Sequence, residues 1–387
     1  MRFAYLLALA SLSTLSFGAV VKRADCGGGR SASDAKCCVW YDVLDDLQAD
    51  LFHSEPCGKA VHESLRLSFH DAIGYSKSLL SEGKYGGGGA DGSIIIHRDV
   101  ELAFPLNKGL GEDLCRNHLL RSCIKQATDS IVDRQLRVGL SHNVSYGDLV
   151  QFAAAVGITD CPGSPRLEFL TGRSMETQPS PEGMLPDAAA SVDTLIERHA
   201  DAGFSANDMV DLLIAHTIGG QEHINPSTPN TPFDTTQMVF DTQFFIETLL
   251  NGTSPPFGGV QPGEAIPPLN GAFRLASDHL IARDPRTACR WQSYANDQEL
   301  MRQRFRAIMS KLAVLGHDRD DLVDCSEVIP EVREVKKEPF LPAGKTMDHI
   351  EASCPDTPFP TLTADPGPET AIHPEKLPGK NETEAAL

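Results

Sequence analysis

The sequence has few aromatic residues, few basic ones and no paired-cysteine motif. Of its 387 residues, 6% are aromatic and only two are tryptophan. Lysine and arginine number 34 against 53 acidic residues, which gives a net charge of −19. Because like charges repel, a chain this acidic is not expected to bind nucleic acid or an anionic membrane surface. None of the ten cysteines stands in a CxxC pair, so a zinc site of that kind is not predicted.

Long apolar runs are missing as well, except at the N-terminus. Residues 1–23 read MRFAYLLALASLSTLSFGAVVKR, with Arg2 first, then an apolar stretch and small residues near Gly18. This order is typical of a secretory signal, and the run is too short to anchor the chain in a bilayer. The dibasic pair Lys22-Arg23 predicts cleavage before Ala24. We therefore expect a secreted, extracellular protein whose residues 1–23 form a signal peptide and a short propeptide.

The cysteines agree with an oxidising compartment. All ten follow the signal, which allows up to five disulfides. Cys37 and Cys38 are adjacent, so each must pair with a different partner. Sequons at Asn143, Asn251 and Asn381 predict glycosylation.

The chain shows neither an internal repeat nor convincing alternating strands. Apolar residues recur at helical spacing, and the pattern predicts helices at 43–52, 59–72, 145–158, 191–203, 205–218, 243–250, 273–284 and 297–316. Beyond about residue 327 the sequence is proline-rich and irregular, and it reads as a loose tail past Thr363. These patterns predict an all-α protein.

The segment LRLSFHDAIG, residues 65–74, carries the first candidate site. Arg66 and His70 are four residues apart, so on a helix they project from one face. A permanent cation beside a titratable base suggests catalysis, whereas the alternative is a polar helix face with an ordinary histidine.

Four further segments add candidate groups. YGGGGADGSIII supplies alternating oxygen donors on a glycine loop, which suits calcium or merely forms a turn, and TPFDTTQMVFD has similar spacing. In AHTIGG, His216 lies in the last turn of an apolar helix, where a core histidine is the ordinary interpretation. In SDHLIARD, Asp278 lies on an apolar face, where an unpaired carboxylate would be costly.

Taken together, the order and spacing of these motifs resemble the plant-type heme peroxidase superfamily, and specifically its secreted fungal branch, class II. The resemblance runs from about Cys26 to Pro368 and includes the LTADPGP segment. It implies a two-domain helical fold with non-covalent heme b between a distal domain (24–190) and a proximal domain (191–326). Residues 327–387 would form an extended C-terminal segment.

The resemblance also implies a role for each candidate residue. His70 would be the distal base that moves a proton between the oxygens of hydrogen peroxide, and Arg66 would stabilise the charge that develops. Phe69 would pack on the distal heme face, Asn107 would accept a hydrogen bond from His70, and Glu101 would support that network. On the other side, His216 would bind the iron, Asp278 would accept its second N–H, and Phe233 would pack beside it.

Two calcium sites and a disulfide pattern follow from the same resemblance. The distal calcium ligands would be Asp71, the Gly89 carbonyl, Asp91 and Ser93, and the proximal ligands Thr217, Asp234, Thr236, the Val239 carbonyl and Asp241. The implied disulfides are Cys26–Cys37, Cys38–Cys325, Cys57–Cys161 and Cys289–Cys354, which leaves Cys115–Cys123 as a local pair.

Departures from the family pattern bear on the substrate. Manganese-oxidising members carry three acids where this chain has Lys59, Glu63 and Glu222, and a lysine disfavours a cation site. Lignin-oxidising members carry an exposed tryptophan where this chain has Asp211, while Trp40 and Trp291 are expected in the core. We expect a monomeric generic peroxidase that oxidises small phenols and aromatic donors at the heme edge. The alternatives are a manganese peroxidase with a two-acid site, Glu63 and Glu222, and a calcium-stabilised binding protein on an inactive scaffold.

Overall fold

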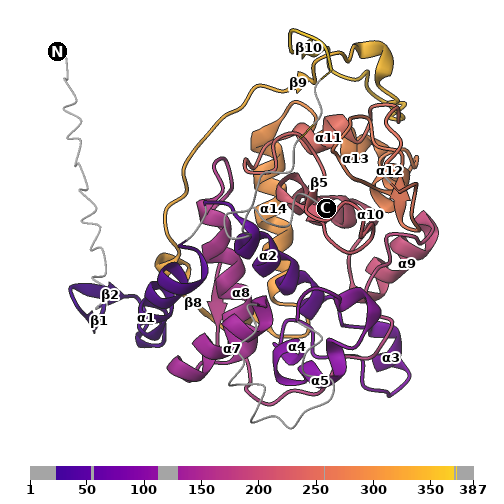
Figure 1. The fold of residues 1–387 in the computed structure, drawn as a ribbon. Helices are drawn as coiled ribbons and strands as arrows, with labels where there is room; N and C mark the ends of the chain where they lie inside the picture. The colour runs from indigo at the N-terminus through magenta and orange to yellow at the C-terminus, as the bar shows by residue number, and fades with distance from the viewer. Residues whose placement is uncertain (1–22, 54–55, 112–129, 257, 370–371, 373–387) are drawn as a thin grey trace, which may run out of the picture.

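The computed structural model describes residues 23–53, 56–111, 130–256, 258–369 and 372. Helices dominate this part of the chain, which confirms the all-α prediction (Figure 1). The helices are α1 (Val39–Asp46), α2 (Lys59–Ala72), α3 (Lys77–Ser81), α4 (Ser93–Ile96), α5 (Arg98–Glu101), α7 (Ile131–His142), α8 (Tyr146–Gly157), α9 (Val192–Ala202), α10 (Ala206–Leu212), α11 (Gln243–Glu247), α12 (Ala276–Ile281), α13 (Ala288–Gln292) and α14 (Gln298–Ala313).

The strands are short and form isolated pairs. Antiparallel pairs join β1 (Ala24–Gly27) to β2 (Arg30–Ala32), β3 (Leu170–Thr171) to β8 (Val323–Asp324), β4 (Gly220–Gln221) to β5 (Thr231–Pro232), and β6 (Glu264–Ala265) to β7 (Arg274–Leu275). One parallel pair joins β9 (Phe340–Leu341) to β10 (Thr363–Ala364). Because every strand except β1 and β2 has only two residues, no strand period is visible in the sequence.

Local capping explains where several helices begin. The hydroxyls of Ser145, Ser191 and Ser205 each accept a hydrogen bond from the backbone N–H three residues on, at the start of α8, α9 and α10. At Ser205 the Asp208 side chain completes a capping box. Gly203 ends α9 with φ +101°, a conformation that favours glycine. These boundaries agree with the prediction.

Other boundaries differ from the prediction. α1 begins four residues early, at Val39, and a π-helical turn (Leu47–Leu51) continues it. α10 ends at Leu212, and a 3₁₀ turn (Leu213–Ile218) carries the chain to His216 in place of the predicted α-helical turn. α12 is shorter than predicted because Arg274–Leu275 pairs as a strand. α7 was not predicted at all, although its buried residues recur at helical spacing.

The core has two aromatic centres. α8 is buried along nearly its whole length, and it packs against α2 and α7. Near it, Trp40 contacts Phe152 and Phe169 with ring centroids 4.8 and 4.7 Å apart. Trp291 lies in a second aromatic cluster, beside α11, so both tryptophans are buried as predicted.

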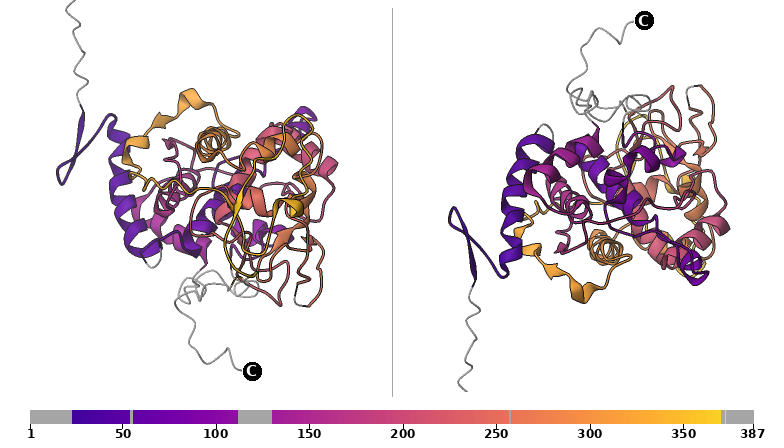
Figure 2. Two further views of the ribbon diagram at one scale, coloured as in Figure 1. Left: turned by 90° about the horizontal axis from the view of Figure 1, so that it is seen from above. Right: turned by 90° about the horizontal axis from the view of Figure 1, so that it is seen from below.

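Most of the early part of the chain and most of the late part lie on opposite sides of the molecule (Figure 2). The exceptions include α14, which packs against both α2 and α10, and the segment around β8, which lies beside α1 and is bonded to Cys37 through Cys325. After β8 the chain runs along the outside of the molecule to β9 (Figure 1). The predicted domain boundaries at 190 and 326 stay predictions.

Four disulfides are present in the described part of the chain, and two of them correct the expected pairing. Cys26 bonds to Cys38, and Cys37 bonds to Cys325, so the predicted pairs Cys26–Cys37 and Cys38–Cys325 are wrong. The adjacent cysteines point in different directions: Cys37 is buried toward β8, whereas half-exposed Cys38 faces the β1–β2 hairpin. The hairpin brings the Cα atoms of Cys26 and Cys38 to 5.0 Å.

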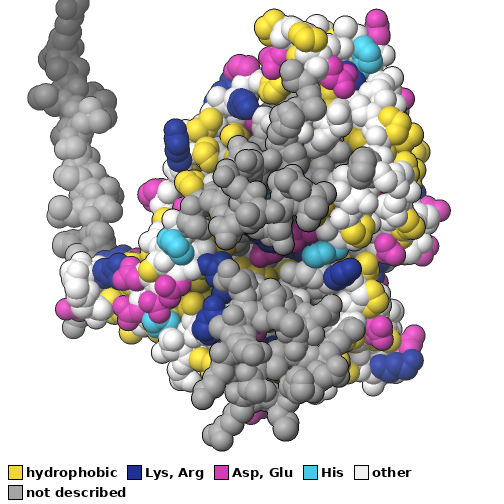
Figure 3. Space-filling view, viewed as in Figure 1, with side chains coloured by type: hydrophobic (Ala, Val, Ile, Leu, Met, Phe, Trp, Pro, Cys, Tyr) yellow, Lys and Arg dark blue, Asp and Glu magenta, His cyan; other side chains and the backbone are white. Residues whose placement is uncertain are grey.

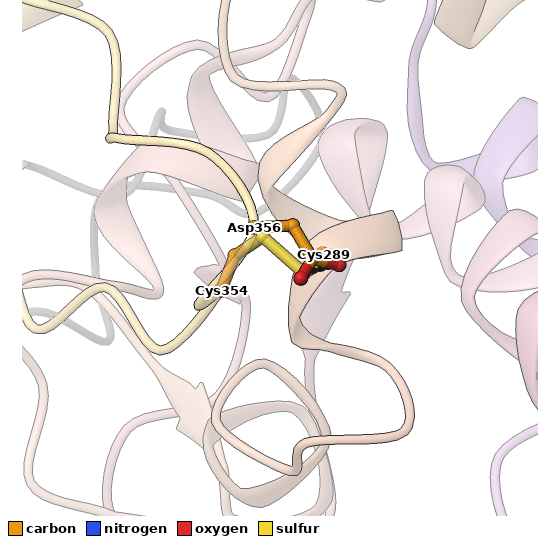
Figure 4. A group of neighbouring side chains, drawn as sticks. All are labelled: Cys289, Cys354 and Asp356. Carbon is orange, nitrogen blue, oxygen red and sulfur yellow. Dashed lines mark hydrogen bonds between the residues drawn. A yellow bond between two sulfur atoms is a disulfide. The ribbon is translucent and has the colours of Figure 1, made fainter.

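The other pairings have different outcomes. Cys57–Cys161 and Cys289–Cys354 are bonded as predicted. Asp356 lies beside the Cys289–Cys354 bond (Figure 4), but the two sulfurs are bonded to each other and cannot act as thiolate ligands, so this group is no metal site. The predicted Cys115–Cys123 pair and residues 1–22 lie outside the described residues.

Within the described ranges, no helix combines the length and apolarity needed to cross a bilayer. Figure 3 shows acidic and basic side chains interspersed over one face.

Candidate active site

Helix α2 presents the distal candidates. Its buried residues, among them Leu65 and Ser68, face the core, which leaves Arg66, Phe69 and His70 half-buried on another side. The Arg66 Nε–H points to His70 Nε2 at 3.3 Å. A second guanidinium nitrogen of Arg66 donates to the carbonyls of Leu106 and Lys108, at 3.2 and 3.0 Å. The predicted four-residue spacing therefore places the cation directly beside the imidazole.

The other ring nitrogen of His70 is held by Asn107. His70 Nδ1 donates to Asn107 Oδ1 at 2.8 Å, and Asn107 Nδ2 donates to the Glu101 carbonyl at 2.8 Å. Glu101 thus supports the network through its backbone, while its carboxylate accepts from the Ser180 N–H at 3.0 Å. Burial, together with the charge of Arg66, lowers the pKa of His70 to about 3. The imidazole is therefore a neutral base at neutral pH, with its basic nitrogen at Nε2.

A second histidine is held in the same way by a different segment. His216 Nδ1 donates to Asp278 Oδ2 at 2.9 Å, and Asp278 is only 1% exposed. The rings of Phe233 and Phe244 lie 5.0 and 5.6 Å from the His216 ring. Among the described residues, nothing donates a hydrogen bond to His216 Nε2. This nitrogen is free to bind a metal.

The two histidines share one pattern of hydrogen bonding through Nδ1. Each is oriented through Nδ1 by a residue far away in sequence; Nε2 of His70 accepts from Arg66, whereas Nε2 of His216 has no donor among the described residues. Both side chains are half-buried although their orienting partners, Asn107 and Asp278, are fully buried. A nitrogen ligand with an anionic second partner is the arrangement that peroxidase-type heme iron takes.

Acidic residues cluster beside each histidine. Asp71 follows His70 directly, and its carboxylate accepts from the Gly92 N–H at 2.9 Å, while Asp91 accepts from the Ser93 N–H at 2.9 Å. Burial and the neighbouring Asp91 raise the pKa of Asp71 well above its usual value. Gly89 has φ +75°, and a Cβ there would collide with the Leu315 carbonyl. Two buried carboxylates this close fit a bound cation.

The second acidic cluster adjoins His216. Thr217 Oγ1 donates to the Asp241 carbonyl at 2.8 Å, and Thr236 Oγ1 donates to Asp241 Oδ1 at 2.9 Å. Asp234 Oδ1 accepts from the Thr236 N–H at 2.7 Å. Burial and Asp241 raise the pKa of Asp234 well above its usual value. Val239, the remaining predicted ligand, closes the loop through its N–H, which donates to the Thr236 carbonyl at 2.8 Å.

Where manganese-oxidising members carry three acidic residues, this chain has two glutamates and Lys59, which pairs with both of them. Lys59 Nζ lies 2.5 Å from Glu222 Oε1 and 3.6 Å from Glu63 Oε1. Burial raises the pKa of Glu63 to about 7, against the opposing effect of Lys59. Both acids are therefore paired with Lys59 and do not form an open two-acid site.

Asp211, at the position where lignin-oxidising members carry an exposed tryptophan, is buried in this chain. Its carboxylate is 4% exposed, and it accepts from Arg290 Nε at 2.7 Å and from an Arg290 terminal nitrogen at 2.6 Å. The Tyr294 hydroxyl also donates to it. Sequence reasoning missed these partners because about 80 residues separate them from Asp211 along the chain.

Comparison with known proteins agrees with this geometry. The chain matches the peroxidase family over residues 43–297 and the fungal peroxidase extension region over residues 300–376. The chain belongs to the peroxidase family. It is 49% identical, over 90% of its length and 91% of the relative, to proteins named peroxidase from Arthromyces ramosus and Coprinopsis cinerea. Ligninase B of Phanerodontia chrysosporium is 44% identical over 96% of both chains, and manganese peroxidase 3 of Phlebia radiata is 44% identical over 97% and 99%.

Membership decides the class of activity. Enzymes of the peroxidase family carry heme and use hydrogen peroxide to oxidise a reducing substrate, so this chain is a heme peroxidase. The similarity to the two proteins named simply peroxidase supports the generic type.

Proposed function

We propose that this enzyme oxidises small phenols and aromatic donors at the heme edge, with His70 and His216 on opposite heme faces. The observation that carries the proposal is the matched pair of oriented histidines. His70 is held through Nδ1 by Asn107 and has Arg66 beside its Nε2, and His216 is held through Nδ1 by Asp278. Bound heme would supply the iron that takes oxidising equivalents from peroxide.

The distal residues would handle the proton of the peroxide. His70 would take the proton from one oxygen of hydrogen peroxide and deliver it to the other oxygen, which would leave as water. Arg66 stabilises the negative charge that develops while the O–O bond breaks. Asn107 would fix the tautomer of His70 that makes this possible, and Phe69 would pack on the same face of the heme. The guanidinium of Arg66 and the neutral imidazole of His70 would act together because they lie side by side, and neither would act well alone.

The proximal residues would hold the iron. His216 Nε2 is the ligand, and the buried Asp278 carboxylate makes the ring a stronger electron donor by accepting its Nδ1–H. Phe233 limits rotation of the His216 ring. An inactive binding protein on this scaffold would have no use for these intact pairs.

Two calcium ions would occupy the acidic clusters. The distal site comprises Asp71, the Gly89 carbonyl, Asp91 and Ser93, and the proximal site comprises Thr217, Asp234, Thr236, the Val239 carbonyl and Asp241. Support comes from the burial of the carboxylates in each cluster and from their raised pKa values. Cations with oxygen ligands would offset the cost of burying these acids.

The pairing of Lys59 with Glu63 and Glu222 argues against manganese as the main substrate. A divalent cation would have to displace the ammonium group before it could bind. Lignin-type oxidation is disfavoured as well. The position of the tryptophan that lignin-oxidising members carry is occupied here by Asp211, which is paired with Arg290.

We further propose that the enzyme is secreted as a glycosylated monomer. The four disulfides support an oxidising compartment. Of the sequon residues, Asn143 is exposed and Asn251 is half-buried, whereas Asn381 lies outside the described residues.

One substrate panel tests the proposal. The purified holoenzyme is given peroxide with a small phenol, a non-phenolic aromatic, or Mn²⁺, and initial rates are measured. We expect turnover of the phenol, little turnover of the non-phenolic donor, and no saturable Mn²⁺ oxidation. Saturable Mn²⁺ oxidation without phenol turnover would overturn the generic assignment in favour of the two-acid site.

A further inference from the structure

A continuous series of ring contacts leads from His216 into the protein. The His216 ring contacts Phe244 with a centroid distance of 5.6 Å, and Phe244 contacts Trp291 at 5.3 Å. Phe245 lies 4.9 Å from Trp291 and 5.0 Å from Tyr294. The rings come from the turn after α10, from α11, and from α13 with the residues after it, which lie next to one another in Figure 1. Tyr294 is thereby joined to the heme ligand by packed rings alone.

Tyr294 has an unusual partner for a buried phenol. The side chain is 0% exposed, and its hydroxyl donates to Asp211 Oδ1. The same carboxylate accepts two hydrogen bonds from Arg290, whose guanidinium lies 5.6 Å from the centre of the Tyr294 ring. A carboxylate can take the phenolic proton, and Arg290 remains to carry the positive charge that is left.

Trp291 is closer to His216 in this series but lacks such an acceptor. Its Nε1–H donates to the Phe245 carbonyl at 3.1 Å, and a carbonyl oxygen is not a base that takes up a proton. Loss of an electron would therefore leave a cation on a fully buried ring, which is costly in a medium of low polarity. Of the two oxidisable rings, only Tyr294 can end as a neutral radical.

We propose that Tyr294 is an internal oxidation site that reduces the peroxide-oxidised heme by one electron when no donor is present. The phenol O–H bond breaks, its proton forms an O–H bond with Asp211, and one electron passes to the heme. The products are a neutral tyrosyl radical, protonated Asp211, and heme reduced by one electron. An external donor later returns the electron, and the proton returns from Asp211. The inference rests on the proposed function, because peroxide turnover supplies the oxidant.

Electron paramagnetic resonance tests the inference on the holoenzyme. The enzyme is mixed with peroxide without any donor, frozen at short times, and examined for an organic radical. We expect a tyrosyl signal that narrows when the protein is labelled with ring-deuterated tyrosine. In Tyr294→Phe most of this signal should be lost. The exposed tyrosine control, Tyr85→Phe, should keep it.

Two comparisons make the result decisive. If Tyr294→Phe does not bind heme, Asp211→Asn replaces it, because an amide keeps the hydrogen-bond acceptor but cannot take the proton, and the signal should again be lost. A signal unchanged in both variants, or no tyrosyl signal in a wild-type sample that oxidises phenol, would overturn the inference alone. A wild-type sample that binds heme but oxidises no phenol would overturn the proposed function instead.

Discussion

Replacing His199 with phenylalanine should make the protein resist mild acid. His199 lies on α9, is 5% exposed, and stacks on Phe69 with a centroid distance of 6.3 Å. Its Nδ1–H donates to the Leu195 carbonyl at 2.8 Å. Burial lowers the pKa of His199 to about 4 in the folded protein. Phenylalanine can keep the stacking and carries no titratable group.

The sign and size of the effect follow from linkage. Between pH 6.5 and 4 the unfolded chain binds a proton at His199 that the folded chain does not, so acid favours unfolding. The full stability is present above pH ~6.5 and is lost as the pH falls toward 4. With about 1.4 kcal/mol for each pKa unit, the loss at pH 4.5 is about 2.5 kcal/mol. His199→Phe should not lose this part of the unfolding free energy, because it has no group to protonate at that position.

Denaturant unfolding at pH 7 and pH 4.5 measures the difference. The quantity to compare is the pH-induced change in unfolding free energy of the wild type minus that of His199→Phe. The exposed histidine control, His53→Phe, should behave like the wild type. Equal acid sensitivity in His199→Phe and the wild type would show that His199 is protonated as easily in the folded protein as in the unfolded one.

Three further predictions concern the active site. His70→Ala should slow the reaction with peroxide by ~10²–10⁴ in stopped-flow absorbance, because the proton acceptor is lost; a rate within a factor of two of the wild type would contradict its role. Prolonged calcium chelation should lower activity and change the heme absorbance spectrum, and added calcium should restore both; full activity after verified calcium removal would refute the two sites. Lys59→Glu should create saturable Mn²⁺ oxidation, since a third carboxylate replaces the ammonium group, whereas the surface control Lys36→Glu should not; no gain would show that geometry and not charge excludes the ion.

Local signals explain what the sequence predicted well. The range of α2 was predicted to the residue, and serine caps marked the starts of α8, α9 and α10. Within α2, the spacing of Arg66 and His70 predicted their contact, which the structure confirms at 3.3 Å. Interactions within one or two helical turns depend on backbone geometry alone, so sequence spacing is sufficient to find them.

Contacts between distant segments explain what the sequence predicted poorly. The partner of Cys37 could not be chosen by spacing, because both Cys26 and Cys325 satisfy the requirement that adjacent cysteines pair apart. The 3₁₀ turn at Ala35–Cys37 and the β1–β2 hairpin place Cys26 beside Cys38, which leaves Cys37 to bond with Cys325. Asp211 is a similar case, since an acid in an apolar helix gives no hint of Arg290, and only packing of α13 on α10 brings the two together.

The two histidines show why the active site was still found from the sequence. Each is fixed on one side by a distant side chain, Asn107 or Asp278, a pairing that the family resemblance implied although residue spacing did not. On the other side, each precedes a residue of an acidic cluster, Asp71 after His70 and Thr217 after His216. A shift of either cluster would therefore rotate the backbone that carries a histidine, and the Nδ1 hydrogen bond would have to stretch. If calcium ions occupy the proposed sites, this arrangement would couple them to the heme spectrum through the backbone next to each histidine.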